Sequence, residues 1–291
     1  YYLKDNYPTL TSERQKAEQQ KEEQNLVVGV PSWNVLEKEM RATPPSVWLF
    51  ITNEQNEIIR RISLKNEKGF HRVAWDLKNT SPYSVNKNNK KDIPAGSLVV
   101  PGLYHGQVFK HVDGVFTPIS DKVDIEVVPL RSGTLEGAPL EEVVAFIQKV
   151  QALSAKGSDL SQQLKTAKSL AAMQKAAYLR APKSEVQLEK QLSEAIQTLK
   201  LLDEQLNGSP ARKEVGEKNE YPTFWNYLFA ANYGTSFSTY GPTPSHQKSF
   251  ANAQALYEQL KVSLDEQLVI LNQLGERLNE IGAPAIQEGS R

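Results

Sequence analysis

The chain of 291 residues contains no cysteine, only two methionines, and equal numbers of basic and acidic side chains, 34 of each. The lack of cysteine excludes disulfides, thiolate metal sites and a cysteine nucleophile. The formal net charge of zero provides no long-range field for an anionic partner, so we expect no nucleic-acid binding. No hydrophobic run approaches the roughly 18 residues of a transmembrane helix, and we expect no membrane span.

Common catalytic and nucleotide-binding motifs are missing too: the sequence has no G-x-S-x-G, no P-loop and no G-x-G-x-x-G. Metal-ligand spacing is absent among the histidines, which are His71, His105, His111 and His246. His105 and His111 flank a predicted turn and could approach each other, but no carboxylate pattern completes a site. Asp76, at the end of a predicted strand, suits a turn-capping acceptor better than a general acid. We therefore predict no catalytic residue, no metal and no cofactor.

Residues 1–132 are predicted to form an antiparallel immunoglobulin-like β-sandwich with a helical insertion at 4–45. The insertion contains a charge-dense helix at 11–24 and a shorter helix whose packing face is Trp33, Leu36 and Met40. From Ser46 the apolar residues alternate with a period of two, as in half-buried strands. These strands are short and separated by turn residues, which is typical of a sandwich; they are expected at 47–52, 57–63, 69–77, 103–110 and 121–128.

Residues 133–291 are predicted to form a second, helical domain. After a linker at 133–139, apolar residues recur at helical spacing in three long segments, with Gly157-Ser158 as a possible break in the first. Three amphipathic helices, each with one apolar face, bury those faces best as an antiparallel three-helix bundle. The predicted fold class is therefore a multidomain α+β protein.

An aromatic-rich loop is predicted at 221–250, before the last helix. Its candidate binding residues are Trp225, Tyr227, Tyr233, Tyr240 and His246. Exposed aromatic rings stack on sugar rings or clasp a peptide, because they bury a large area at low entropic cost. The alternative is a satellite cluster that fastens the loop to the bundle or to the sandwich.

Four short segments, in this order, resemble a known bacterial family. They are Tyr-Tyr-Leu-Lys at 1–4, Gly-Phe-His-Arg-Val-Ala-Trp-Asp-Leu at 69–77, Val-Pro-Gly-Leu-Tyr at 100–104 and Thr-Tyr-Gly-Pro-Thr at 239–243. Together they resemble the C-terminal region of exported proteins with an N-terminal sortilin-like, neuraminidase-repeat β-propeller, often labelled glycosyl hydrolase. The sandwich portion is similar to the immunoglobulin-like domain of flagellar hook-cap proteins.

The resemblance implies an accessory region that follows propeller domains, with no catalytic residues to carry over to this chain. The sequence begins at Tyr1, inside a predicted strand and without an initiator methionine, so we expect a piece of a longer protein whose targeting segment lies upstream. The expected function is a non-catalytic accessory or interaction module that binds the upstream propeller domains or another protein. The alternative is a carbohydrate-binding accessory region of a glycoside hydrolase. The implied location is periplasmic, outer-membrane-associated or secreted.

Overall fold

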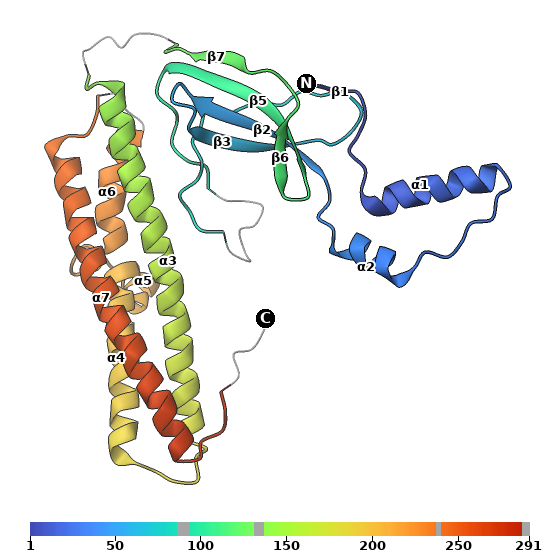
Figure 1. Cartoon of the computed structure of the whole chain (residues 1–291). Coiled ribbons are helices and arrows are strands. Elements are labelled where there is room, and N and C mark those ends of the chain that lie inside the picture. The colour runs from blue at the N-terminus through green and yellow to red at the C-terminus, as the bar shows by residue number, and fades with distance from the viewer. Residues whose placement is uncertain (86–93, 131–136, 237–239, 287–291) are drawn as a thin grey trace. The chain divides into compact units, whose positions relative to one another are not determined.

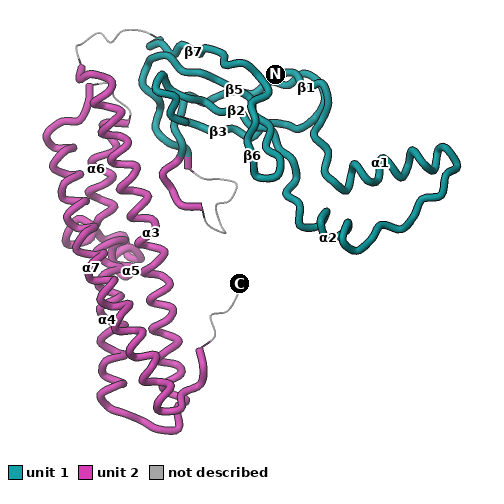
Figure 2. The backbone as a smooth tube through the Cα atoms, viewed as in Figure 1, with its two compact units in different colours: residues 1–80, 95–132 teal, residues 81–94, 133–291 magenta. Residues whose placement is uncertain are grey.

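The structure is a computed structural model that describes residues 1–85, 94–130, 137–236 and 240–286. The described residues form seven helices and two antiparallel sheets (Figure 1). The chain divides into two compact units, residues 1–80 with 95–132 and residues 81–94 with 133–291 (Figure 2). All the strands lie in the first unit and the long helices in the second. This segregation of strands and helices fits the predicted α+β class.

The main sheet has five antiparallel strands. At its centre β2 (Ser46–Asn53) pairs with β3 (Ile58–Leu64) on one side and with β5 (Gly102–Val112) on the other. The far side of β5 pairs with two short strands, β6 (Val115–Pro118) and β7 (Val123–Val127). Thus β6 and β7 share one edge of the sheet, where the sequence predicted a single strand at 121–128.

One face of the main sheet holds most of the apolar core of this unit. Val47 and Ile51 are fully buried there because alternate residues of a strand point to the same face. They pack against residues outside the main sheet, namely Leu3, Val73, Trp75 and Val99. Leu3 belongs to β1 (Tyr2–Leu3), which pairs with β4 (Gly69–Phe70) in a separate two-stranded sheet.

The opposite face of the main sheet is covered by aromatic side chains of its own strands. The rings of Phe50 and Phe109 stack with centroids 4.4 Å apart, and Phe116 of β6 lies 5.1 Å from Phe50. The guanidinium of Arg61 sits 4.7 Å from the centroid of the Phe50 ring, in cation–π geometry. This face is therefore largely closed by contacts among its own side chains.

The strand predicted at 69–77 is wrong beyond its first two residues, since β4 ends at Phe70. Local turn chemistry competes with the sheet: the Asp76 carboxylate accepts the N–H of Lys78 at 3.2 Å, and Leu77 has a positive φ of 55°. Phe70 is exposed rather than buried, whereas Trp75 still packs against the sheet.

The insertion at 4–45 contains two helices, as the sequence predicts: α1 (Leu10–Glu23) and α2 (Trp33–Arg41). Thr9 caps α1, because its hydroxyl accepts the N–H of Ser12 at 3.1 Å. No residue of α1 is buried, which fits a helix that is polar on all sides.

The second unit contains three long and two short helices: α3 (Leu140–Tyr178), α4 (Val186–Asn207), α5 (Pro210–Glu214), α6 (Phe224–Ser236) and α7 (Pro244–Glu280). The long helices α3, α4 and α7 each contact the other two, and α6 contacts all three. Two contacts show that α3 and α7 run parallel. Near their starts the rings of Phe146 and Phe250 are 5.7 Å apart, and near their ends the amide of Gln174 donates to the carbonyl of Leu271 at 2.7 Å.

The core of the helical unit consists mostly of leucine and alanine from the inward faces of these helices, together with Val150, Ile281, Phe146, Phe224 and Tyr178. The possible break at Gly157-Ser158 is wrong, because α3 continues through both residues. Gly157 instead faces the fully buried ring of Phe224, which brings α6 into the core.

Candidate functional site

The apolar face of α2 is exposed. Trp33 is 81% and Met40 87% exposed, and Leu36 between them is half-buried. The sequence predicted these three residues as a packing face. That prediction is wrong for Trp33 and Met40 within the described part of the chain. Large apolar side chains that lie together on one exposed helix face are typical of an interaction surface.

A bidentate ion pair orients α2. The guanidinium of Arg14 in α1 donates to both carboxylate oxygens of Glu39 in α2, with Nε–Oε1 at 2.7 Å and Nη2–Oε2 at 3.1 Å, and its Nη1 donates to Glu18. The Glu39 side chain is only 7% exposed. Glu39 lies roughly a third of a turn around the helix from Trp33 and Met40. The contact with α1 therefore holds one side of α2 and leaves its Trp33 and Met40 side exposed.

The same ion pair sets the electrostatics of this surface. Hydrogen bonding to Arg14 lowers the pKa of the Glu39 carboxyl below its usual value, because a positively charged donor favours the ionised form. The carboxylate in turn raises the pKa of the Arg14 guanidinium. A carboxyl group that acts as a general acid at neutral pH needs a raised pKa. The pKa of Glu39 is lowered instead, as expected for a carboxylate in a structural ion pair.

A short extended segment connects α1 to α2. Residues 26–30, Leu-Val-Val-Gly-Val, have no helix or strand assignment, and Val27 and Val30 are 92% and 95% exposed. The Leu26 N–H donates to the Lys21 carbonyl at 2.9 Å. Within the described residues, no hydrogen bond involves the backbone groups of 27–30. Exposed valines with unpaired backbone groups are a second feature that this chain alone does not explain.

The segment 221–250, predicted as an aromatic-rich loop, is largely helical: it contains α6 and the start of α7, while residues 237–239 lie outside the described part. Two of its predicted binding residues have structural contacts. The Trp225 indole N–H donates to the Asn207 side-chain oxygen at 2.9 Å, and its ring packs against Phe224. Tyr227 is partly buried against the helical core. These contacts match the alternative of an aromatic cluster that fastens the segment to the helices.

The other three predicted residues lie at separate places. His246 completes a capping box at the start of α7: its Nδ1 accepts the N–H of Thr243 at 3.2 Å, and its own N–H donates to the Thr243 hydroxyl. Tyr240 is exposed. Tyr233 is exposed and forms a ring pair with Phe229, with centroids 5.3 Å apart. The structure thus does not gather the five residues into one pocket, and a binding role for the exposed ones stays a prediction.

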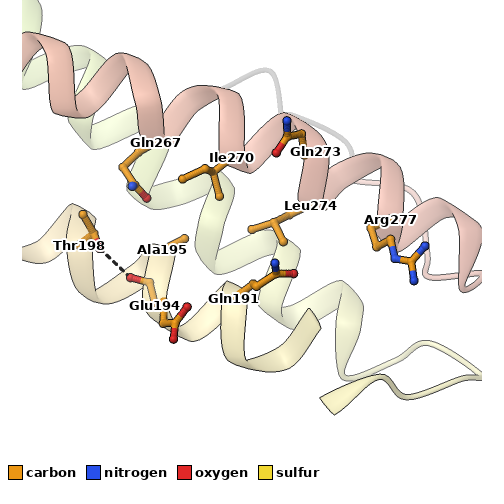
Figure 3. A pocket seen from close by; sticks show the side chains of 9 residues that line it. All are labelled: Gln191, Glu194, Ala195, Thr198, Gln267, Ile270, Gln273, Leu274 and Arg277. Atoms are coloured by element: carbon orange, nitrogen blue, oxygen red, sulfur yellow. Dashed lines mark hydrogen bonds between the residues drawn. The ribbon is translucent and has the colours of Figure 1, made fainter. Parts of the chain in front are cut away.

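A groove between α4 and α7 was not predicted from the sequence. It encloses about 540 Å³ (Figure 3) and is lined by Gln191, Glu194, Ala195 and Thr198 of α4 and by Gln267, Ile270, Gln273, Leu274 and Arg277 of α7. The lining combines apolar side chains with three amides and with charged groups. Arg277 is already paired with Glu185 and Glu280. Such residues occur throughout the exposed faces of helices, so no sequence signal distinguishes them.

Histidines and acidic residues form no metal site in the part of the chain that the structure describes, where no three of them come together in ligating positions. His105 and His111 both lie on β5, not on opposite sides of a turn. His105 pairs with Asp124 at 2.8 Å, and His111 stacks on Phe116 at 4.3 Å. Each ring therefore has a local partner of its own.

Comparison with known proteins gave no match to a family model, to a curated protein or to a solved structure. Among the described helices, none is long and apolar enough to cross a lipid bilayer. The candidate site must therefore be judged on its own geometry.

Proposed function

We propose that this chain is a non-catalytic accessory module that binds a protein domain through the exposed face of α2. The observation that carries the proposal is the exposure of Trp33 and Met40 on a helix whose other side is fixed by the Arg14–Glu39 ion pair. Trp is strongly enriched among the residues that dominate binding energy at interfaces, and Met adapts to irregular apolar surfaces.

The partner in this proposal is a β-propeller domain that precedes this region in a longer exported protein, with another protein as the other possibility. The resemblance of the four short segments supports this context, as it supports a periplasmic, outer-membrane-associated or secreted location. We further propose that the strands of the first unit are an immunoglobulin-like sandwich and that the long helices are a three-helix bundle with α6 added. The layering of Leu3, Val73 and Trp75 on one face of the main sheet supports the first of these. The mutual contacts of α3, α4 and α7 support the second.

The test is a binding measurement between this chain and the separately produced preceding domains of its parent protein. The double variant Trp33→Ala/Met40→Ala should weaken binding at least about tenfold, since removing one interface anchor costs about 1–2 kcal/mol or more. The matched control is Val186→Ala, which trims an equally exposed apolar side chain in the helical unit and should leave the affinity unchanged. Equal affinities of the double variant and the unmodified chain would refute the role of α2.

A second candidate function is carbohydrate binding, and the exposed ring pair of Phe229 and Tyr233 favours it. Rings exposed on one side of a helix offer a flat apolar platform for a sugar face. Glycan-array binding should be lost in Phe229→Ala/Tyr233→Ala and kept in Trp225→Phe, because Trp225 packs against the core. If the unmodified chain binds no glycan, this candidate is removed.

A further inference from the structure

We propose that residues 26–30 of one molecule add as an extra strand to the outer edge of β7 in a second copy of this chain. The inference goes beyond the function proposed above, because it uses the backbone of 26–30 and leaves the Trp33 and Met40 face of α2 free for another protein.

The donor segment has the composition and the ends of a strand. Three of its five residues are valine, a strong strand former. The segment starts after Asn25, whose positive φ of 56° turns the chain out of α1. It stops before Pro31, which cannot donate a ladder hydrogen bond. Residues 26–30 are thus bounded as a strand would be.

Most backbone N–H and C=O groups of this segment are unpaired within the described chain. Along the described chain, the N–H and C=O groups of residues 27–30 have no protein partner. An extended peptide of this kind gains main-chain hydrogen bonds when it lies along an exposed sheet edge, and pockets for alternate side chains then set its register.

Among the described strands, β7 offers an acceptor edge that matches the donor in length. The main sheet has two edges, and the β3 edge already contacts a neighbouring segment: Thr80 donates its N–H to the Ile59 carbonyl at 2.9 Å, and the Arg60 side chain donates to the Asn79 carbonyl at 3.3 Å. At the other edge β7 pairs with β5, and no described residue pairs with its outer side. Open strand edges of this kind recruit further strands.

Donor and acceptor match in length and in pattern. Both have five residues, and β7 alternates apolar and acidic side chains as Val-Asp-Ile-Glu-Val. Ile125 and Val127 pack toward the core, whereas Asp124 points outward and is exposed. With Val28 opposite Ile125, three apolar residues of the donor (26, 28 and 30) extend the core-facing row. The donor carries no charge, so Asp124 and Glu126 meet no like charge across the ladder.

A second copy is the occupant that these observations favour. Each chain carries both the donor and the acceptor, so two molecules can exchange strands reciprocally. Such an arrangement is two-fold symmetric and closed, and two-fold symmetric dimers are the commonest homo-oligomers.

The oligomeric state in solution tests the proposal directly. The unmodified chain should be a dimer by light scattering coupled to size-exclusion chromatography. Val28→Pro should raise the dimer dissociation constant at least about tenfold, because proline removes a ladder donor in the middle of the strand. Since the Val28 N–H has no partner within the described chain, this variant should keep the far-UV circular dichroism spectrum of the unmodified protein, which shows that each chain still folds.

Two controls separate this proposal from the function proposed for α2. Val28→Thr keeps the branched side chain and the N–H, and it should remain dimeric. Trp33→Ala should also remain dimeric, although it is expected to lose the other protein partner. A chain that is monomeric at every concentration tested, or a Val28→Pro variant that dimerises as well as the unmodified chain, overturns the strand exchange and leaves the role of Trp33 untouched.

Cysteine cross-linking tests whether residues 26–30 lie along β7. The chain has no native cysteine, so the introduced cysteines are the only thiols that can react. Val27→Cys and Glu126→Cys variants, mixed under mild oxidation, should form a disulfide heterodimer if the strands are antiparallel; Val27→Cys with Asp124→Cys should do so if they are parallel. Neighbouring strands place facing Cα atoms about 4.5–5.5 Å apart, within disulfide range. Failure of both mixtures contradicts addition to a second copy. A chain that carries Val27→Cys together with Glu126→Cys or Asp124→Cys and forms a disulfide only within itself contradicts it too.

Discussion

Gly157 lies in the middle of α3, where its missing side chain makes room for the ring of Phe224. A Cβ atom at this position would lie 2.2 Å from Cε1 and 2.6 Å from Cζ of that ring. The ring is fully buried, so it cannot move aside without disturbing its neighbours. The close approach explains why a residue with poor helix propensity occupies the interior of a 39-residue helix.

We therefore expect Gly157→Ala to destabilise the helical unit. Alanine would favour the helix by about 1 kcal/mol, but overpacking a closed core costs about 1–3 kcal/mol. The overlap with the ring is severe, so the packing cost should exceed the gain. Urea unfolding followed by far-UV circular dichroism measures the difference.

Gly275 of α7 provides the matched control, because it is also a glycine inside a long helix. A Cβ there would meet only the Gln174 side-chain nitrogen, at 3.3 Å. The gain of about 1 kcal/mol in helix propensity is offset by this tight contact, so Gly275→Ala should be near neutral. If Gly157→Ala proved as stable as Gly275→Ala, the proposed seating of Phe224 would be incorrect.

At the scale of single residues, two of the predicted binding residues have structural contacts. Trp225 and His246 were predicted because aromatic and imidazole groups often bind ligands. In the structure, the Trp225 indole N–H donates to the Asn207 side chain, and the His246 ring accepts the N–H of Thr243. The cap at Thr243 had a sequence signal, since a threonine followed by proline at the first helical position is a typical helix start. The contact of Trp225 had none, because it depends on how α6 packs against the end of α4.

At the scale of elements, the attachment of α1 to α2 depends on ionised Glu39. Its pKa is lowered mainly by hydrogen bonding to Arg14. For a carboxyl group whose pKa is lower in the folded state than in the unfolded chain, the stabilisation is complete above the unfolded value. It is lost as the pH falls through the folded value. The contact between the two helices should therefore loosen in acid and persist at neutral and alkaline pH.

An NMR titration of the Glu39 side-chain carbon checks this expectation. Its midpoint should lie below the usual glutamate range in the unmodified chain and should move upward in Arg14→Gln. Arg41→Gln, which removes the exposed Arg41–Glu37 pair, is the control and should leave the Glu39 midpoint in place. An identical midpoint in Arg14→Gln and the unmodified chain would show that the pair does not form.

The elements differ in how well the sequence predicted them, for physical reasons. Helical spacing of leucines predicted α3, α4 and α7, because a long apolar stripe has few other solutions. The strand expected at 69–77 ends at Phe70, and a turn at Asp76 and Leu77 ends the alternating run that follows. The alternation of apolar and polar residues does not reveal where a side chain will hydrogen-bond to the nearby backbone and form a turn.

At the scale of the whole chain, the sequence predicted the change from strands to helices after Pro129 but not the candidate site. Trp33, Leu36 and Met40 have the spacing of a packing face, and that spacing is the same whether the partner lies within the chain or outside it. Only the tertiary structure shows that Trp33 and Met40 lack a partner among the described residues. The groove between α4 and α7 was equally unpredictable, because it arises where two helix surfaces meet.

The separation of the apolar clusters leads to a prediction about the helical unit. Every member of its core comes from residues 146–283, and the clusters around the sheet contain residues 1–127 alone. Two hydrogen bonds link residues 81–85 to α3: the Tyr83 and Ser154 hydroxyls are 2.7 Å apart, and Ser84 donates to Asp159. Such exposed or half-buried hydrogen bonds contribute about 1 kcal/mol each, far less than a continuous leucine core.

A fragment of residues 133–291 should therefore fold alone, with a helical far-UV spectrum and one cooperative thermal transition. Tyr83→Phe in the full chain should shift the corresponding transition by only a few degrees. A fragment with a random-coil spectrum would show that the strand-rich unit is required for the helices to fold.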